Sequence, residues 1–211
     1  MRQRNVKNLE ERIEKSSTYL VREPKSNKGK WHEAFGNNNP IYLEIGSGKG
    51  QFIMKKAAMN PDNNYIAVEG QENVGFRILE KTEEAKLNNV LCFLDFIHDI
   101  NDYFEKGEIA GIYLNFSDPW KKARQAKRRL TYHENIKRFK DVLNGGMIEF
   151  KTDNEPLFEF SLEEVKSCGF EIVEMTRDLH SIDCEYESKY YTTEYEDKFI
   201  RFDKNINYIK F

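Results

Sequence analysis

The sequence has little cysteine and no long apolar run, and these absences exclude several classes of protein. Its 211 residues include only 3 Cys. Cys92, Cys168 and Cys184 lie far apart and form no CxxC pair, so we expect free thiols in a reducing cytoplasm and no zinc site. No apolar stretch has the length of a membrane span, and residues 1–15 lack the apolar core of a signal peptide. We therefore expect a cytoplasmic protein without membrane contact or bound metal.

Charged and aromatic residues are abundant instead. The chain is 33% charged and contains 15 Phe and 11 Tyr, enough to bury the core of one domain. The formal net charge of -3 conceals an uneven distribution, because residues 1–30 and 121–129 are basic while residues 183–197 are acidic. This pattern indicates a local surface for a polyanion. We expect residues 1–30 to form a basic N-terminal extension that can move, and residues 31–211 to form one folded domain.

Short apolar segments alternate with segments of helical periodicity. The pattern predicts strands over 41–45, 65–69, 90–94, 111–116, 147–152, 170–176 and 207–211. It predicts helices over 50–60, 73–86, 132–143 and 156–168, the third of which should stop at Gly145 and Gly146. Strands that alternate with helices, and that are apolar throughout, predict a mostly parallel α/β sheet with helices on both faces.

The first strand-to-helix turn, "LEIGSGKGQF", has the composition of a ligand-binding loop. Gly46, Gly48 and Gly50 allow a sharp turn and a close approach of the backbone to a ligand. The nicotinamide fingerprint GxGxxG would require glycine at position 51, which is Gln51. A GxGxG turn after an acidic strand is instead typical of Rossmann-like S-adenosylmethionine sites.

Two acids occupy strand positions that would bring them close to this turn. Glu44 lies inside the first strand, where a carboxylate needs a partner such as the methionyl ammonium group. Glu69 ends the second strand, where it could accept hydrogen bonds from both ribose hydroxyls of an adenosine. The alternative is an ordinary loop with a surface acid on an edge strand. The combination of the two acids with the glycines favours the cofactor site.

The stretch "NFSDPWKKARQAKRRLT" follows the fourth predicted strand. Ligands in open α/β sheets bind beyond the carboxyl ends of the strands, so Asp118 should lie close to the cofactor. Trp120 either anchors the loop in the core or stacks on a base. Six of the nine residues 121–129 are Lys or Arg. A solvated charged face is the ordinary explanation for such a run, but its position after Asp118 favours contact with phosphates.

These residues resemble the bacterial tRNA (guanine-N7-)-methyltransferases. The resemblance runs from about residue 28 to the end and depends on "LEIGSGKGQF", "YIAVEG", "YLNFSDPW", "KRRLT", "FKTDN" and "TEYEDKF". It implies a Rossmann-like class I methyltransferase fold with a mostly parallel seven-stranded sheet over residues 31–211. It also implies methyl transfer from S-adenosylmethionine to a guanine in the variable loop of tRNA.

The resemblance also assigns roles to individual residues. The cofactor-binding residues would be Glu44, Gly46, Glu69, Asp95 and Asp118, with Asp118 also at the catalytic position. The substrate-binding residues would be Lys122, Asp153, Thr193, Glu194, Tyr195 and Glu196. Two departures from the family pattern stand out. The loop "DPWKKARQ" lacks the family's second Pro and its His, and should be more mobile. Counting from Glu69 places Phe96 where the family has an acid, so we assign that role to the neighbouring Asp95.

The chemistry of guanine N7 agrees with this residue set. N7 has a free lone pair, so it can attack a sulfonium methyl group without losing a proton, and positioning should supply most of the acceleration. We find no Ser/His/Asp or metal constellation, and expect His32, His98, His133 and His180 to be ordinary surface or loop residues. Two alternatives remain: an exocyclic-amine nucleic-acid methyltransferase and a non-catalytic RNA-binding module. The sequence leaves open whether the protein is a monomer or a homodimer.

Overall fold

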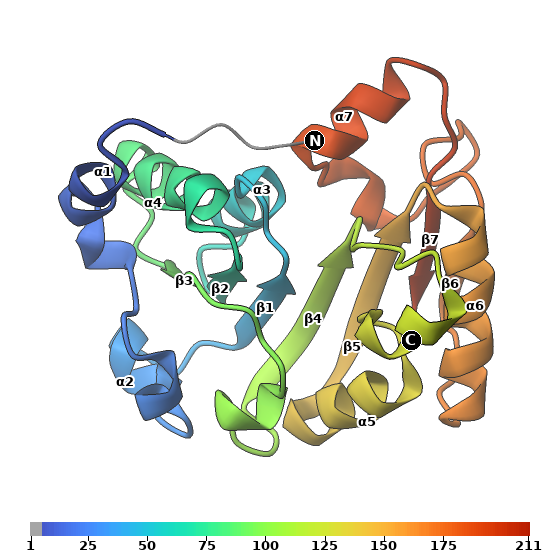
Figure 1. Ribbon diagram of the computed structural model, residues 1–211, viewed down its shortest axis with the longest axis horizontal. Coiled ribbons are helices and arrows are strands. Elements are labelled where there is room, and N and C mark those ends of the chain that lie inside the picture. The colour runs from blue at the N-terminus through green and yellow to red at the C-terminus, as the bar shows by residue number, and fades with distance from the viewer. Residues whose placement is uncertain (1–5) are drawn as a thin grey trace.

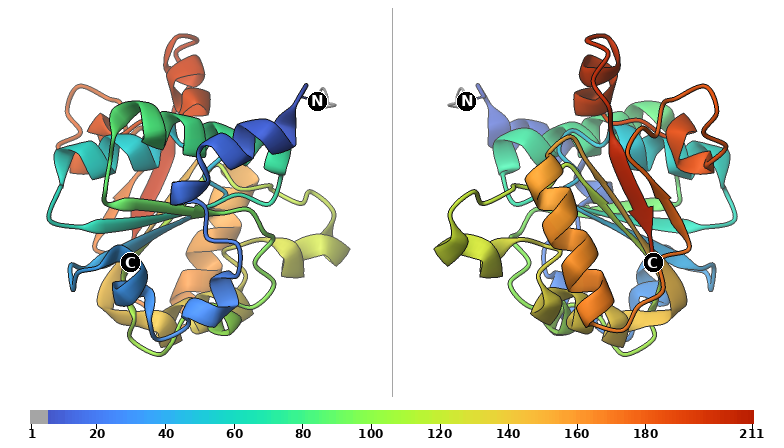
Figure 2. Two further views of the ribbon diagram at one scale, coloured as in Figure 1. Left: turned by 90° about the vertical axis from the view of Figure 1, so that its left-hand side faces the viewer. Right: turned by 90° about the vertical axis from the view of Figure 1, so that its right-hand side faces the viewer.

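The computed structural model describes residues 6–211, which form one seven-stranded sheet with helices on both faces (Figures 1 and 2). The strands are β1 Ile41–Ile45, β2 Asn64–Val68, β3 Val90–Phe93, β4 Ile109–Asn115, β5 Leu143–Thr152, β6 Glu174–Thr176 and β7 Asn207–Lys210. Their order across the sheet is β3-β2-β1-β4-β5-β7-β6, and β7 runs antiparallel to both of its neighbours. The predicted fold class, a mostly parallel seven-stranded sheet of the Rossmann-like type, is confirmed.

Seven α-helices lie within the described residues. They are α1 Leu9–Lys15, α2 Trp31–Phe35, α3 Gln51–Met59, α4 Glu72–Ala85, α5 His133–Val142, α6 Glu155–Ser167 and α7 Glu194–Ile200. One core cluster joins β1, β4 and β5 to α5 and α6, and a second joins β2 and β3 to α3 and α4. Successive β2 residues alternate between the two clusters, because strand side chains point alternately to opposite faces. A sheet covered on both faces in this way buries continuous apolar runs such as "YIAV".

The two glycines after α5 have a different role from the predicted one. The helix ends at Val142, and β5 begins directly at Leu143, so Gly145 and Gly146 lie inside the strand. A Cβ atom on Gly146 would come within 1.8 Å of the Ala110 carbonyl oxygen of β4. The β4–β5 register shifts at this place. The helix ends within one residue of the predicted position, but the glycines do not cap it: they form an irregularity in β5 that lets two strands approach closely.

The sixth predicted strand is shorter than its apolar pattern suggested. The sequence predicts a strand over 170–176, but only Glu174–Thr176 pairs with β7. Met175 in this edge strand, and Val173 just before it, are about half exposed. The short pairing reflects the position of β6 at the rim of the sheet, where one side has no neighbouring strand.

The N-terminal segment contacts the rest of the molecule from α1 onward. Arg12 forms an ion pair with Glu80 of α4 at 2.7 Å, and its guanidinium lies over the Phe76 ring. The Val21 amide donates to the Cys92 carbonyl of β3. Residues 1–5 of the predicted extension lie outside the described part of the chain, and the division of the chain at residue 30 stays a prediction. Within residues 6–211, no helix is both long enough and apolar enough to cross a membrane.

Candidate functional site

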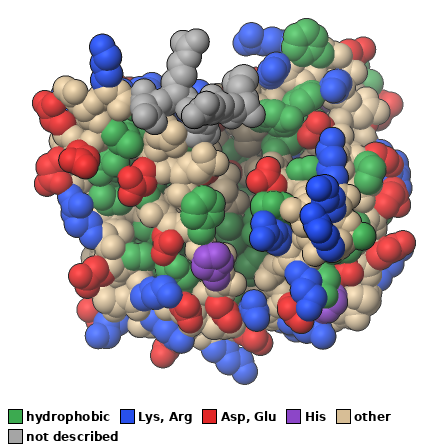
Figure 3. All heavy atoms as spheres, viewed as in Figure 1, with side chains coloured by type: hydrophobic (Ala, Val, Ile, Leu, Met, Phe, Trp, Pro, Cys, Tyr) green, Lys and Arg blue, Asp and Glu red, His purple; other side chains and the backbone are tan. Residues whose placement is uncertain are grey.

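The carboxyl ends of β1, β2 and β4 open into a cleft of about 840 Å³. Its lining includes Gly46, Glu69, Asp95 and Asp118, which are four of the five predicted cofactor residues. Lys127 and Arg128 of the basic run line the same cleft. In Figure 3 the surface is hollowed near its centre, with Lys and Arg side chains gathered beside the hollow. The fold thus brings the predicted cofactor loop and part of the predicted phosphate-binding run to one place.

The glycine turn begins at the cleft, and its first glycine, Gly46, lines it. Gly46 has a φ of 81°, and no atom lies within 4 Å of the position that a Cβ would take there, so a ligand can approach the backbone closely. Gly50 also has a φ of 81°, but a Cβ there would meet the Ile78 side chain at 2.9 Å. The first glycine therefore leaves room for a ligand, whereas Gly50 permits close packing between α3 and α4.

Glu44 is buried behind the cleft, with 1% of its surface exposed. Its Oε1 accepts a hydrogen bond of 2.7 Å from the Asn115 side chain, which lines the cleft. Its Oε2 has no hydrogen-bond partner among the described residues. Burial raises the pKa of Glu44 to about 7, although the hydrogen bond from Asn115 lowers it. A buried carboxylate with one free oxygen is the arrangement that a cationic ligand group would satisfy.

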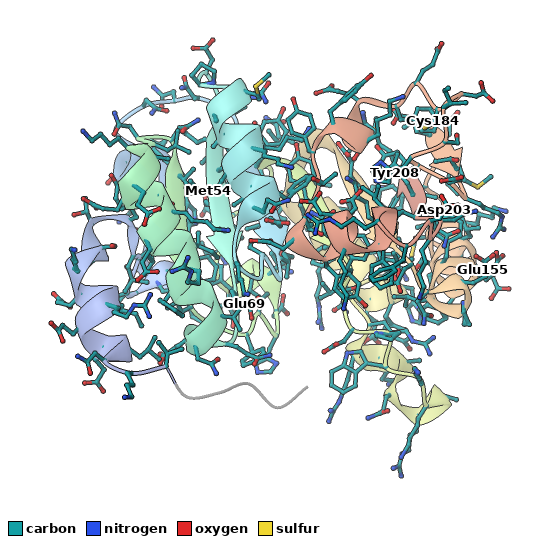
Figure 4. The ribbon with its side chains drawn as sticks, turned by 90° about the horizontal axis from the view of Figure 1, so that it is seen from above. Met54, Glu69, Glu155, Cys184, Asp203 and Tyr208 are labelled. Atoms are coloured by element: carbon teal, nitrogen blue, oxygen red, sulfur yellow. The ribbon has the colours of Figure 1, made fainter. Side chains whose placement is uncertain are left out.

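Glu69 follows β2 and is held by the backbone of two loops. Its Oε2 accepts from the Gly48 amide at 2.9 Å, and its Oε1 accepts from the Gln71 amide at 3.0 Å. Burial raises its pKa, and the negative charge of Asp118 adds a smaller effect in the same direction. Figure 4 looks down on the carboxyl ends of the parallel strands and shows Glu69 beside α4. Each oxygen keeps a free lone pair, so Glu69 can still accept hydrogen bonds from ligand hydroxyl groups.

The far end of the cleft carries Asp95 and an exposed aromatic ring. Asp95 is exposed, and its Oδ2 accepts a hydrogen bond of 2.6 Å from the Tyr103 hydroxyl. Phe96 lines the cleft with 59% of its surface exposed, and its ring covers Gly70, where a Cβ would lie 2.3 Å from the ring. Asp99, the other nearby acid, forms an ion pair with Arg138. This end therefore offers one carboxylate and one apolar ring to a ligand.

The loop after β4 presents Asp118 to the cleft. The Asp118 side chain is exposed and makes no hydrogen bond within the described chain. Phe116 and Trp120, on either side of it, have φ values of 51° and 40°. Positive φ is rare for bulky residues and occurs where the surroundings hold the backbone in place. The basic run forms a 3₁₀ segment at Ala123–Arg128, with Lys122 exposed at its start, outside the cleft lining.

The remaining substrate-binding residues predicted from the resemblance lie at α7 and the end of β5. Glu194 forms an ion pair with Lys81 of α4 at 2.6 Å. Tyr195 is 47% exposed, and its ring packs edge-on against Phe116 at 5.2 Å. Burial raises the pKa of Tyr195, and the charge of the half-buried Asp153 adds to the shift. Contact with Phe116 therefore joins α7 to the Asp118 loop.

Thr193 and Glu196 form the N-terminal cap of α7. The Glu196 amide donates to the Thr193 hydroxyl, and the Thr193 amide donates to the Glu196 carboxylate. Glu196 is fully buried. This carboxylate therefore begins the helix and has no exposed face for a base.

A buried lysine and a histidine complete the surroundings of Glu196. Lys151 of β5 lies 3.2 Å from Oε1 of Glu196 and donates hydrogen bonds of 2.7 Å to the carbonyls of Ser188 and Tyr191. Burial lowers the pKa of Lys151, while the charge of Glu196 opposes this shift. The His180 ring lies 2.7 Å from the same Glu196 oxygen. His180 lies in a loop, as predicted, and in addition its ring contacts a buried carboxylate.

Sequence reasoning did not identify Asn115 as a contact of Glu44, or Lys151 and His180 as contacts of Glu196. Asn115 was visible as a polar residue at the end of an apolar strand, beside the predicted Asp118 loop. Lys151 was visible as a charge inside the apolar segment "MIEFKT". Nothing near His180 in the sequence indicates its contact, because Glu196 lies sixteen positions further along the chain.

Residues 38–209 match a family described as "Putative methyltransferase". A tRNA (guanine-N(7)-)-methyltransferase of Lachnoclostridium phytofermentans is 48% identical, over 94% of this chain and 92% of that protein. Proteins of the same name from Clostridioides difficile and Streptococcus agalactiae are 45% and 44% identical, over 95% and 94% of this chain and 93% of each relative.

Solved structures share the fold at much lower identity. The 16S rRNA methyltransferase KamB superimposes with a TM-score of 0.62 at 13% identity, covering 86% of this chain and 91% of that one. A SAM dependent methyltransferase from Aquifex aeolicus superimposes with a TM-score of 0.53 at 13% identity, covering 96% and 97%. At these identities the likeness shows the fold alone.

Proposed function

The chain belongs to the family of bacterial tRNA (guanine-N7-)-methyltransferases, and we propose that it transfers the methyl group of S-adenosylmethionine to N7 of a guanine in the variable loop of tRNA. The relatives match over 92% and 93% of their own length, which supports this proposal. Because the substrate is tRNA, we place the reaction in the cytoplasm. Either a monomer or a homodimer is compatible with this proposal.

One observation carries the cofactor assignment: the buried, unpaired Oε2 of Glu44, whose other oxygen is bound by the cleft residue Asn115. Such an oxygen is costly to leave unsatisfied, and the methionyl ammonium of S-adenosylmethionine is a cation of suitable size and charge. Glu69 would accept hydrogen bonds from the ribose hydroxyls of the cofactor. The open space beside Gly46 would admit the part of the cofactor that joins its ribose to its methionyl ammonium group. The donor and acceptor set of the cleft therefore fits this cofactor.

We assign the adenine end of the cofactor to Asp95 and its neighbours. Asp95 lines the cleft on the far side of Glu69, and its bond to the Tyr103 hydroxyl fixes one of its oxygens. The other oxygen stays free to accept from an exocyclic amine. The exposed ring of Phe96 lies in the same lining and would add apolar contact.

When bound, the cofactor supplies a methyl group on a positively charged sulfur. The protein's residues need to supply position and charge rather than a base, because N7 of neutral guanine already has a free lone pair. The Asp118 loop and the cleft would hold the guanine in line with the methyl group. The methylated base becomes cationic, so the nearby carboxylate of Asp118 stabilises the charge that develops during transfer.

We propose that the substrate-binding residues act in two groups. Lys122, Lys127 and Arg128 are exposed cations that would contact phosphates. Glu194 pairs with α4, Tyr195 packs on the Phe116 ring, and the charge of Asp153 acts on Tyr195. These three residues would contact the base or its neighbours. Thr193 and Glu196 would support this surface indirectly by holding the first turn of α7.

The proposal is tested by incubating the protein with labelled S-adenosylmethionine and unmodified bulk tRNA, followed by nucleoside analysis. The expected product is 7-methylguanosine. A methyl group on an exocyclic amine would favour the alternative methyltransferase class. If the protein binds tRNA but neither binds the cofactor nor methylates the tRNA, the result would favour a non-catalytic RNA-binding module.

A further inference from the structure

Arg129 differs from the other cations of the basic run in its surroundings. The run contains Lys121, Lys122, Arg124, Lys127, Arg128 and Arg129. The first five are exposed, whereas Arg129 is half-buried. Within the described chain Arg129 forms no ion pair, so its charge is not used to hold an acid. Its side chain turns back toward the loop that precedes the run.

The Arg129 guanidinium donates hydrogen bonds to two successive carbonyl groups of that loop. Nε donates to the Pro119 oxygen at 3.0 Å, and Nη2 donates to the Trp120 oxygen at 3.1 Å. These carbonyls lie on either side of Trp120, whose φ of 40° is unfavourable for a bulky residue. A strained residue persists only when its surroundings hold it in place. Two directed hydrogen bonds from one planar group hold it in this way.

Both the guanidinium and the backbone of Arg129 are held by further contacts. It lies over the Phe160 ring of α6, 4.3 Å from the ring centre. The Asn135 side chain donates to the Arg129 carbonyl at 2.9 Å, and the Arg129 amide donates to Ala126. Arg129 therefore joins the body of the domain to the loop that carries Asp118.

We propose that Arg129 is a positioning residue that sets the direction of Asp118, and that it is not a phosphate contact. The two carbonyls belong to the residues directly after Asp118, and the first of these, Pro119, has a fixed φ. Displacement of these two peptides would turn the Asp118 carboxylate relative to the cleft. This inference rests on the proposed function, because the reaction that Asp118 supports is methyl transfer to tRNA.

The test compares Arg129→Gln with the charge-preserving Arg129→Lys. Lysine keeps the positive charge but has a single ammonium, which cannot reproduce the planar fork that reaches two carbonyls. In single-turnover kinetics with saturating tRNA and cofactor, we expect both variants to lose about 10- to 100-fold in rate, as a misplaced catalytic group does. The tRNA dissociation constant of Arg129→Lys should stay within about threefold of wild type, and its salt dependence should be unchanged.

Two further variants serve as references. Lys137→Gln removes an exposed charge of α5 that is not part of the cleft lining, and should match wild type in rate and affinity. Arg124→Gln removes an exposed cation of the run, and should weaken tRNA binding and lower the log–log salt slope by about 0.7–0.9. Thermal unfolding establishes that each variant is folded.

Fluorescence gives a readout that does not depend on activity. The chain has 2 Trp, of which Trp31 is fully buried, so quenching by acrylamide reports mainly on Trp120. Quenching should increase in both Arg129 variants and stay unchanged in Lys137→Gln.

The proposal is overturned if Arg129→Gln binds tRNA more weakly, with a log–log salt slope lower by about 0.7–0.9, while Arg129→Lys keeps the wild-type affinity and slope. It is equally overturned if both variants keep the wild-type rate and quenching. A wild-type protein that fails to methylate tRNA would instead refute the proposed function, and the quenching experiment would still report whether Arg129 holds the loop.

Discussion

At the scale of the residue, the cofactor site depends on a carboxylate whose protonation is finely balanced. Burial raises the pKa of Glu44 to about 7 from 4.5. The folded protein therefore binds this proton more tightly than the unfolded chain does, and stability from this group falls as the pH rises from about 4.5 to 7. The opposite holds for ligand binding, because only the ionised carboxylate attracts an ammonium group. The ionised form of Glu44 therefore destabilises the folded protein, although it is the form that ligand binding requires.

Glu44→Gln should separate these two effects. Wild-type affinity for S-adenosylmethionine should rise about tenfold between pH 5.5 and 7, where the ligand's own α-amino group, with a reference pKa of about 8, stays charged. The Gln variant should bind more weakly and show no such rise. It should also be more stable than wild type above pH 7, by up to about 3 kcal/mol. Calorimetry and urea unfolding across this range measure both, and a pH-dependent affinity retained by Glu44→Gln would exclude Glu44 as the titrating group.

Asp118 contributes at the same scale through its charge. Asp118→Asn keeps the size of the side chain but removes the negative charge, so methyl transfer should slow by about a hundredfold, on the order of 3 kcal/mol. Binding of tRNA should survive, because phosphate contacts dominate affinity. Single-turnover kinetics at saturating tRNA and cofactor measures the step. A near wild-type rate would mean that Asp118 only shapes its loop.

At the scale of the element, α7 is anchored to the sheet by charged groups that water does not reach. Lys151 and Glu196 are both fully buried, and Glu196 caps the helix through Thr193. The segment "TEYE" has the spacing of a capping box. The sequence therefore contains a signal for the start of this helix, in addition to the substrate-binding roles that the resemblance implies. That signal predicts a helix start, but it cannot predict the buried partner 45 positions away.

Removing one member of the buried pair should destabilise the protein strongly. Lys151→Met leaves the Glu196 charge buried with the His180 ring and the Thr193 amide as its remaining partners, and we expect a loss of about 3–5 kcal/mol in the free energy of unfolding. Glu194→Gln breaks a half-exposed ion pair with Lys81 and should cost at most about 1 kcal/mol. Urea unfolding of both variants measures the contrast. Equal losses in the free energy of unfolding would show that breaking the buried Lys151–Glu196 pair costs no more than breaking a half-exposed one.

Other elements show where sequence reasoning succeeds and where it stops. The alternating pattern predicted β1 to β4 within two residues, because buried parallel strands are continuous apolar runs bounded by turns. The rule that ligands bind at the carboxyl ends of strands placed Gly46, Glu69 and Asp118 in one cleft. The contacts of Asn115, Gly146 and Arg129 could not be predicted, because each depends on which distant segment packs against it.

At the scale of the whole molecule, positive and negative charges are sorted around one cleft. Lys127 and Arg128 line it together with Glu69, Asp95 and Asp118. A chain with a formal net charge of -3 would repel RNA if its charges were spread evenly. The exposed cations beside the cleft instead offer phosphates a local site, while the carboxylates remain for the cofactor and the base.

Replacing Lys122, Lys127 and Arg128 together with Gln should weaken tRNA binding and flatten its salt dependence. Each lost phosphate contact should lower the log–log slope by about 0.7–0.9. Affinity for S-adenosylmethionine should change little, since the predicted cofactor residues are untouched. Binding titrations between about 50 and 200 mM salt provide the measurement. Unchanged affinity and slope would identify the run as a solvated surface.

The most direct test of the whole account is to map the methyl group on a single tRNA. A guanine methylated at N7 carries a positive charge, and after reduction its glycosidic bond breaks, so aniline cleaves the strand at that nucleotide. Unmodified tRNA incubated with the protein and S-adenosylmethionine should be cleaved at one guanine in the variable loop, and should stay intact when either is omitted. Methylation without cleavage, or cleavage at a guanine outside the variable loop, would contradict the account.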